Sequence, residues 1–195
     1  MSDVHGQSSR KPFRGYEKPL VDLEDMAYVN IYFSLGSNLG DREGNILEAL
    51  RRMDDAFGVH YTALSKLIET KPMGFSGGKF LNAAVLYRVP MHRMLIDASV
   101  DTERIEGPWL VLGKIKEIER SMGRTDPPEY DADGRRIYHS RIIYIDILFY
   151  GKEIIDTPEL TIPHKDIASR PFVLIPLREI ARPSLINAFP DIFNH

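Results

Sequence analysis

The 195-residue sequence predicts an α+β protein built as a ferredoxin-like sandwich. Two observations carry this prediction: apolar patterns of the strand and helix type alternate in the order strand, helix, strand, strand, helix, strand, and the strand patterns have a period of two. Such an order places helices on one face of an antiparallel sheet. We expect long mobile loops, rich in glycine and proline, to lie over the other face, where ligands bind.

The hydrophobic content of 43% suffices for one core, so residues 27–195 are expected to form a single domain. Residues 1–26 are rich in Lys, Arg, Ser, Gly and Asp and have few apolar residues. We therefore expect them to form a disordered extension.

The composition argues against several classes of partner and site. Lys and Arg total 25 against 28 Asp and Glu, and this net charge of −3 argues against nucleic acid or an anionic membrane as a partner. The absence of cysteine excludes disulfides and thiolate metal sites. No apolar stretch approaches a membrane span, and the first 25 residues lack the apolar core of a signal peptide. We expect a cytoplasmic protein, monomeric by default.

The first unit is a strand, a glycine turn and a helix. Residues 28–35 alternate as a strand and continue into a turn that contains Gly36 and Gly40. Asp41 is placed to cap a helix whose apolar residues recur at intervals of three and four up to Phe57, and Gly58 ends it.

A second strand is predicted over 60–69, followed by a loop over 70–79 and a third strand over 80–89. Alternation places Phe80, Asn82 and Ala84 on one face of the third strand. An aromatic ring beside an amide suits a planar heterocycle, although in isolation the two residues also fit a core position and a loop cap.

Residues 90–109 are expected to form an insertion or an additional helix, and 112–122 a helix that ends at Gly123. The polar stretch 124–138 is predicted to be a mobile loop, with Pro127 and Pro128 interrupting regular structure. After the last long strand, residues 154–155 suggest a short strand and residues 172–180 a final helix.

The strand over 139–150 carries a carboxylate in an apolar pattern. Alternation places Tyr144, Asp146 and Leu148 on one face, and Ile143, Ile145, Ile147 and Phe149 on the other. A charge in a sheet is costly unless a cation or hydrogen-bond donors meet it. Asp146 is therefore either a metal ligand or half of a buried ion pair.

Five short motifs follow one another along the chain: Leu35–Asp41; Phe80–Ala84; Ile118–Arg120 with Gly123-Arg124; Ser140-Arg141 through Asp146-Ile147; and Leu160–His164 with Arg170–Phe172. In order and spacing they resemble the 6-hydroxymethyl-7,8-dihydropterin pyrophosphokinases of folate biosynthesis, over about residues 28–182. The resemblance implies that ATP donates its β,γ-pyrophosphoryl group to the hydroxymethyl group of the pterin and leaves as AMP. It also implies Mg²⁺ as cofactor, with two ions on the triphosphate.

The resemblance also implies roles for individual residues. Asp146 matches a magnesium ligand, and Arg124 and Arg141 match two loop arginines that meet the phosphates. The positions that match the pterin pocket are Thr70, Met73, Phe80, Asn82 and Phe172. The positions that match the nucleotide site are Glu119, Arg141, Ile147, Thr161, His164 and Arg170.

One position departs from the family pattern, in which two aspartates two residues apart bind magnesium. Here the first of them is Tyr144, and a neutral phenol is a poor magnesium ligand. Three explanations stand: a weakened or inactive homologue, a carboxylate such as Asp131 or Asp133 that reaches in from the loop, or a variant of an ordinary enzyme. Tyr138 stands where the family often has tryptophan.

Three functions remain in competition at this stage. The leading one is an ATP-dependent diphosphokinase with magnesium. The second is a homologue that binds nucleotide or pterin without chemistry. The third, a ferredoxin-like nucleic-acid module, lacks the basic face and the exposed aromatic pair of such proteins.

Overall fold

The computed structural model describes residues 28–72, 77–91, 107–124, 129–130, 136–137 and 140–194. Its main sheet is antiparallel throughout, with the strand order β2-β4-β1-β7 and with β3 paired to β4 as well. The strands of this sheet are β1 (Tyr28–Ser37), β2 (Ala63–Leu64), β3 (Ile68–Thr70), β4 (Phe80–Pro90) and β7 (Tyr144–Tyr150). Strands β2 and β3 together take the place of the second strand that the sequence predicts. The antiparallel sheet with its helices confirms the predicted α+β fold.

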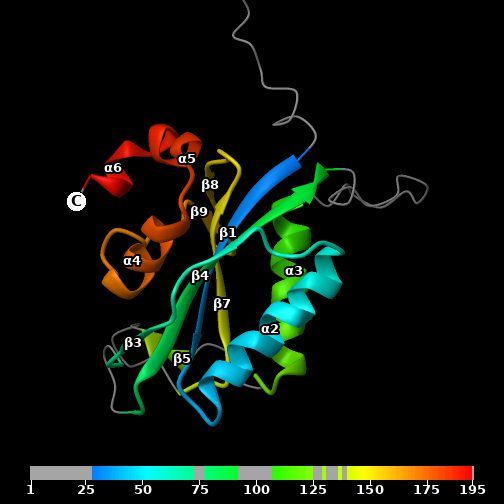
Figure 1. Ribbon diagram of the computed structural model, residues 1–195, viewed down its shortest axis with the longest axis vertical. Helices are drawn as coiled ribbons and strands as arrows, with labels where there is room; N and C mark the ends of the chain where they lie inside the picture. The colour runs from blue at the N-terminus through cyan, green and yellow to red at the C-terminus, as the bar shows by residue number, and fades with distance from the viewer. Residues whose placement is uncertain are drawn as a thin grey trace, which may run out of the picture.

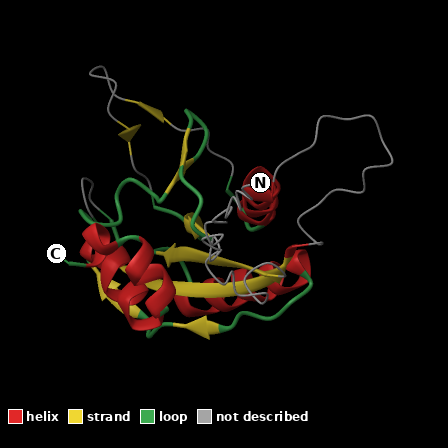
Figure 2. Ribbon diagram, turned by 90° about the horizontal axis from the view of Figure 1, so that it is seen from above, coloured by secondary structure: helices red, strands yellow, loops and turns green. Residues whose placement is uncertain are grey.

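Helices cover both faces of the sheet. The helices α2 (Arg42–Phe57) and α3 (Gly107–Ser121) lie on one face, and α4 (Pro171–Ile180), α5 (Pro183–Ala188) and α6 (Pro190–Phe193) lie on the other (Figure 1). The view from above shows the long strands between helical segments (Figure 2). Helices were expected on one face only, with loops over the other, but α4 also covers part of this second face because its own apolar face has to be buried. Among the described residues, those at the end of the second face near Gly36 lie outside this second core cluster.

Two buried clusters follow from strand alternation. In β1, Val29, Ile31, Phe33 and Leu35 face α2 and α3, whereas Tyr32 packs with residues of α4 and α5. Beyond Tyr32 on this second face come Ser34 and Gly36. A hydroxyl and a glycine offer little apolar surface to bury, so the second cluster ends there and leaves room for a site.

Helix α2 has the boundaries that its sequence predicts. The Asp41 side chain accepts a hydrogen bond from the backbone N–H of Gly44 at 3.0 Å, which satisfies one of the free donors of the first turn. Gly58 ends the helix in the left-handed conformation, with φ of 65°. Its N–H donates to the Asp54 carbonyl oxygen at 2.8 Å.

The alternation predicted for β7 breaks after Ile147. The register between β1 and β7 shifts between Tyr32 and Phe33, because a β-bulge places extra chain on β7. Phe149 therefore joins Leu148 in the cluster under α4 and packs edge-on against Tyr32, with ring centroids 6.1 Å apart. Its assignment to the face of Ile143, Ile145 and Ile147 was wrong.

Two element boundaries differ from the prediction. The single strand expected over 60–69 is divided into β2 and β3, with three residues between them. Helix α3 starts at Gly107, inside the segment expected to be an insertion or an additional helix, and Pro108 occupies its first turn, where a missing N–H costs nothing.

Short elements complete the structure. Strands β5 (Glu129–Tyr130) and β6 (Arg136–Ile137) pair with each other within the stretch predicted to be a loop. Strands β8 (Ile155–Asp156) and β9 (Thr161–Ile162) form a second pair beside β7. Within the described residues, none of the helices combines the length and the apolar composition that crossing a bilayer requires.

Candidate active site at the open end of the sheet

Three adjacent strands bring polar side chains together at the end of the sheet near Gly36. Gly36 of β1 is paired with Asn82 of β4 on one side and with Tyr144 of β7 on the other. Two residues along β1, Ser34 is paired with Asp146. Because side chains of paired residues share a face, Asn82, Tyr144 and Asp146 face the same space, as alternation predicted for Tyr144 and Asp146.

The Tyr144 side chain crosses β1 to reach β4. Its hydroxyl donates to Asn82 Oδ1 at 2.8 Å, and its ring lies edge-on to Phe80, with centroids 6.0 Å apart. Burial, together with the nearby Asp146 carboxylate, raises the pKa of the Tyr144 phenol, so the group stays neutral at physiological pH. Tyr144 therefore supplies no negative charge to this site.

Asp146 is half-buried in β7 and faces the same space as Tyr144. Within the described segments its carboxylate has no ion-pair partner. Asp146 was predicted to be either a metal ligand or half of a buried ion pair. The described residues supply no partner for an ion pair, so the carboxylate is available to a cation. The described residues also contain no cluster of three or more His, Asp or Glu side chains suited to a metal ion.

Arg170, at the start of α4, carries a positive charge near this site. Arg170, which precedes the helix, pairs with Asp166 at 2.8 Å and has its guanidinium 5.9 Å from the centre of the Phe172 ring. The positive charge of Arg170 lowers the pKa of the Tyr144 phenol, against the larger effect of burial, so the two residues lie near each other. Arg170 and Phe172 thus come from the sequence-distant end of the chain to the same place.

The buried Glu119 side chain binds the outer edge of β7, which no other described strand of the main sheet pairs with. Glu119 of α3 is 2% exposed, accepts a hydrogen bond from the Ile145 N–H at 2.9 Å and forms an ion pair with Arg124. Burial raises the pKa of Glu119, and the Arg124 guanidinium opposes this effect. Glu119 thereby satisfies an otherwise unpaired strand donor and holds Arg124 beside the sheet edge.

The two arginines predicted to meet the phosphates line one cavity. Arg124 and Arg141 surround a space of about 150 Å³, together with Leu39, Gly123, Ser140, Ile142 and Ile143. They come from opposite ends of the 124–141 segment. The structure therefore brings together the pair that the sequence placed at the two ends of a loop.

The remaining residues predicted for the nucleotide lie along the same free edge. The His164 backbone N–H donates to the Leu148 carbonyl oxygen at 3.0 Å, and Thr161 lies in β9 close by. The Ile147 side chain is 4% exposed and belongs to the core, so a ligand meets this position only through its main chain. Strand residues two apart direct their N–H and C=O groups to the same edge, so those of Ile147 point outward like those of Ile145.

Asn38 is a site residue that the sequence reasoning missed. Its side chain accepts from the Arg141 N–H at 2.7 Å and donates to Ser140 Oγ at 3.0 Å and to the Gly78 carbonyl oxygen at 3.3 Å. The Asn38 N–H also donates to the Arg141 carbonyl oxygen at 3.1 Å. Asn38 thus ties three loops together and positions the backbone of Arg141. The only signal in the sequence was its place inside the first motif.

Some predicted residues cannot be located. Met73, Tyr138, Asp131 and Asp133 lie outside the described residues.

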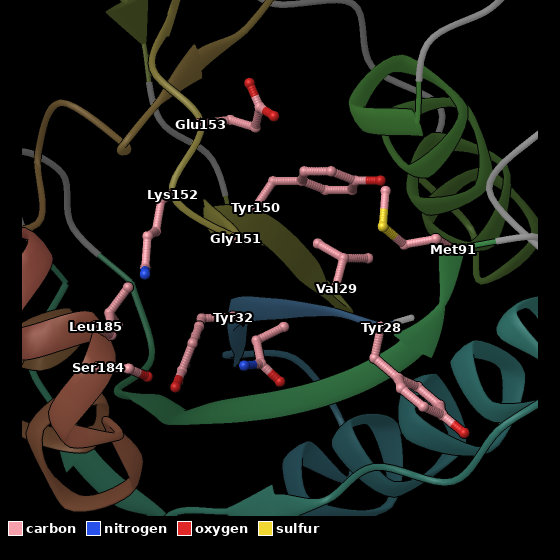
Figure 3. A pocket seen from close by; sticks show the side chains of 11 residues that line it. Tyr28, Val29, Tyr32, Met91, Tyr150, Gly151, Lys152, Glu153, Ser184 and Leu185 are labelled. Atoms are coloured by element: carbon pink, nitrogen blue, oxygen red, sulfur yellow. The ribbon is translucent and has the colours of Figure 1, made fainter. Parts of the chain in front are cut away.

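A larger cavity, of about 230 Å³, lies at the other end of the sheet, where Tyr32, Tyr150 and Leu185 line it (Figure 3). It contains none of the residues predicted to act on a ligand.

Gly36 gives a prediction about stability. A Cβ atom built on Gly36 would lie 2.0 Å from Tyr144 Cε1, and the Gly36 backbone does not have a positive φ, so the ring alone opposes a side chain there. We expect Gly36→Ala to lower the free energy of unfolding by about 1–3 kcal/mol. In a Tyr144→Ala background the same change is expected to be neutral or stabilising by up to about 1 kcal/mol. Urea unfolding of the four proteins measures both values, and equal costs in the two backgrounds would contradict the contact.

Glu119 gives a prediction about pH. Its pKa in the folded protein lies above the ordinary value of 4.5, so its contribution to stability is full below that pH and is lost as the pH rises through the folded-state pKa. Glu119→Gln removes this dependence. Between about pH 4 and about pH 7, the free energy of unfolding of the wild type should therefore fall relative to that of the variant. Urea titrations at both pH values test this, and a relative gain by the wild type would show the opposite sign.

The fold and the site together define a class: α+β proteins with an amide and an aromatic ring beside a carboxylate and arginines at one end of an antiparallel sheet. Residues 32–182 match the family described as 7,8-dihydro-6-hydroxymethylpterin-pyrophosphokinase (HPPK). The chain belongs to this family.

Several relatives share this match. The chain is 37% identical over 161 residues to a folate synthesis bifunctional protein of Arabidopsis thaliana, covering 82% of this chain and 28% of that protein. It is 36% identical over 153 residues to a 2-amino-4-hydroxy-6-hydroxymethyldihydropteridine pyrophosphokinase of Porphyromonas gingivalis, covering 77% and 90% of the two chains. The corresponding protein of Bacillus subtilis is 31% identical, with 77% of each chain covered. The chain thus spans about a quarter of the bifunctional relatives and most of the shorter ones.

A solved structure supports the fold. The structure titled "Crystal Structure Analysis of the HPPK-DHPS in complex with substrates" superposes with a TM-score of 0.52 at 14% sequence identity, over 86% of this chain and 43% of that one. At this identity the likeness concerns the fold alone.

Proposed function

We propose that this protein transfers pyrophosphate from ATP to 6-hydroxymethyl-7,8-dihydropterin, giving AMP and the pterin diphosphate in folate biosynthesis. The observation that carries the proposal is the meeting of Asn82, Phe80 and Asp146 at one end of the sheet in a chain of this family. The relatives named pyrophosphokinases support the same activity.

The pterin half of the site is assigned to β3, β4 and the start of α4. A pterin has a flat ring and an edge that alternates hydrogen-bond donors and acceptors. Phe80 and Phe172 supply aromatic surface for the ring, and the Asn82 amide, held by Thr70 at 2.9 Å, reads the edge. Met73 is proposed as a further contact on the basis of its position in the motif.

The nucleotide half is assigned to the free edge of β7. The outward main chain of Ile147 and the neighbouring Thr161 suit an adenine ring, because backbone groups pair with its edge. Arg124, Arg141 and Arg170, with His164, provide positive or donor groups for the phosphates. Pyrophosphoryl transfer needs charge neutralisation and alignment more than covalent help, and arginines supply both.

The residues fit one magnesium ion better than two. Magnesium is commonly bound by one or two carboxylates together with substrate phosphates and water, and it neutralises phosphate charge when bound. Asp146 is the carboxylate that would hold it. Tyr144 adds no charge, and the Glu119 carboxylate, which interacts electrostatically with Asp146, is already bound to the Ile145 N–H and to Arg124. The expected two-ion arrangement therefore depends on groups outside the described residues.

The proposed reaction can be written in terms of this chain's residues. The hydroxymethyl oxygen of the pterin attacks the β-phosphorus of ATP and releases its proton to solvent, while the bond between the α,β-bridging oxygen and the β-phosphorus breaks and AMP leaves with that oxygen. Asn82 and Phe80 orient the pterin, and Arg124 and Arg141 align the phosphates and stabilise their charge. Incubation with the pterin and MgATP is expected to release AMP and the pterin diphosphate together. Formation of ADP, or no pterin-dependent product, would refute the proposal.

A homologue that binds without chemistry is the alternative raised by Tyr144. The family match and the named relatives do not favour it. We also propose that the protein acts as a cytoplasmic monomer, without nucleic acid or membrane as a partner, which agrees with its net charge of −3.

A further inference from the structure

The Tyr144 ring occupies space that a glycine leaves open. A Cβ atom on Gly36 would lie 2.0 Å from Cε1, 2.4 Å from Cζ and 2.6 Å from the hydroxyl oxygen of Tyr144. The ring therefore lies flat across β1, between β7 and β4. An aspartate at this position is too short to cross the strand, so this arrangement depends on the tyrosine.

The hydroxyl of Tyr144 is hydrogen-bonded to the Asn82 amide, the group proposed to recognise the edge of the pterin. It donates to Asn82 Oδ1 at 2.8 Å, while Asn82 Nδ2 donates to Thr70 Oγ1 at 2.9 Å. Both ends of the amide are thereby bonded inside the protein. The Tyr144 ring also contacts Phe80, at 6.0 Å between centroids, so the phenol touches two of the residues assigned to the pterin.

A buried hydroxyl marks the floor of the same space. Ser34 is 1% exposed, and its Oγ makes no hydrogen bond of good geometry to any described group, although it lies beside the Tyr144 phenol. Polar groups buried in this way are normally bonded. The Ser34 hydroxyl is therefore available to a ligand once the Tyr144 ring moves away.

We propose that Tyr144 is a specificity-determining residue that competes with the pterin for the Asn82 amide, so that a bound pterin takes the place of the phenol. This inference rests on the proposed function, because it takes the fused aminopyrimidinone edge of a pterin as the ligand of Asn82. An N–H donor of that edge replaces the hydroxyl donor of Tyr144 at Oδ1. The ring of the ligand replaces the phenol ring beside Phe80.

With competition of this kind, the apparent affinity for pterin is the intrinsic affinity multiplied by the fraction of protein in which the Asn82 amide is free. One hydrogen bond between neutral groups shifts such an equilibrium by about threefold to tenfold. Tyr144→Phe keeps the ring over Gly36 and removes only the bond to Asn82, so it is expected to tighten pterin binding by that factor. Tyr144→Ala also removes the ring and is expected to tighten it by more than about tenfold.

A matched control lies on the same strand. Tyr150 is buried in β7, and its side chain lines the cavity at the opposite end of the sheet (Figure 3). It lies six positions along the strand from Tyr144, which is roughly 20 Å. Tyr150→Phe therefore removes a phenol hydroxyl without touching Asn82, and pterin affinity should remain that of the wild type.

The experiment titrates the four proteins with the fluorescent probe 6-hydroxymethylpterin, without ATP or magnesium. In parallel, NMR of ¹³C-labelled tyrosine follows the ring signal that disappears in Tyr144→Phe. The proposal expects tighter binding in both Tyr144 variants and a pterin-dependent shift of the Tyr144 signal in the wild type.

Equal affinities in the wild type and both Tyr144 variants, or a Tyr144 signal that pterin leaves unchanged, would overturn the competition even if the enzyme makes pterin diphosphate. Displacement of the phenol without any diphosphate product under turnover conditions would overturn the proposed function alone. No pterin binding by any of the four proteins would overturn both.

Discussion

Replacing Asp146 by asparagine is expected to lower the rate of pyrophosphate transfer by about a hundredfold or more. Asp146 is the carboxylate that faces the site from β7, and the nearby Glu119 carboxylate is already paired with Arg124. Asparagine has the same shape but neither holds a cation well nor carries charge. Steady-state kinetics at saturating ATP and pterin measure the loss.

The fold should survive this change, because the Asp146 carboxylate has no ion-pair partner among the described residues. Asp191→Asn is a suitable control, since Asp191 is an exposed residue of α6 outside the site. Its rate should match that of the wild type. Near-normal turnover by Asp146→Asn would show that another group holds the magnesium.

Replacing Tyr144 by aspartate is expected to raise the rate about tenfold or more and to lower the magnesium concentration required for half-maximal activity. The change places a second carboxylate on the face of Asp146, two residues away along β7, where it would share the cation. It also removes the phenol from Asn82. A magnesium titration of both proteins at fixed ATP and pterin gives the comparison.

Tyr144→Asn separates these two effects. It releases the Asn82 amide as aspartate does, but it adds no charge. We expect it to improve pterin binding while leaving the magnesium requirement near that of the wild type. Equal magnesium curves for the aspartate and asparagine variants would show that the carboxylate adds nothing and that the site is already complete.

Local rules were enough to predict the elements and much of the site. Asp41 and Gly58 bound α2 because each solves a local backbone problem, the free N–H groups at one end and a left-handed residue at the other. Alternation placed Tyr144 and Asp146 on one face of β7, and Phe80 and Asn82 on one face of β4. The register with β1 then shows that these two faces lie on the same side of the sheet.

Features that depend on long-range packing could not be predicted. The bulge opposite Tyr32 moves Phe149 to the other face, and no residue type in β7 marks it. The coverage of the second face by α4 depends on where the chain after β9 returns. Local patterns contain no information on either.

The contact between Tyr144 and Asn82 required a coincidence of register. The two residues lie on strands that do not pair, and the ring crosses between them only because Gly36 of β1 lies at the same level. Asn38 escaped notice for a similar reason, since its partners Gly78 and Arg141 are distant in sequence. In both cases the sequence shows the residue type but does not show which residue it contacts.

The transfer of two phosphate groups as one unit is the central claim, and isotope tracing tests it most directly. ATP labelled at the γ-phosphate and ATP labelled at the α-phosphate are each incubated with the enzyme, magnesium and 6-hydroxymethyl-7,8-dihydropterin. We predict that the γ label moves to the pterin product and the α label stays in AMP. Release of the γ label as inorganic phosphate, or its absence from the pterin, would contradict the claim.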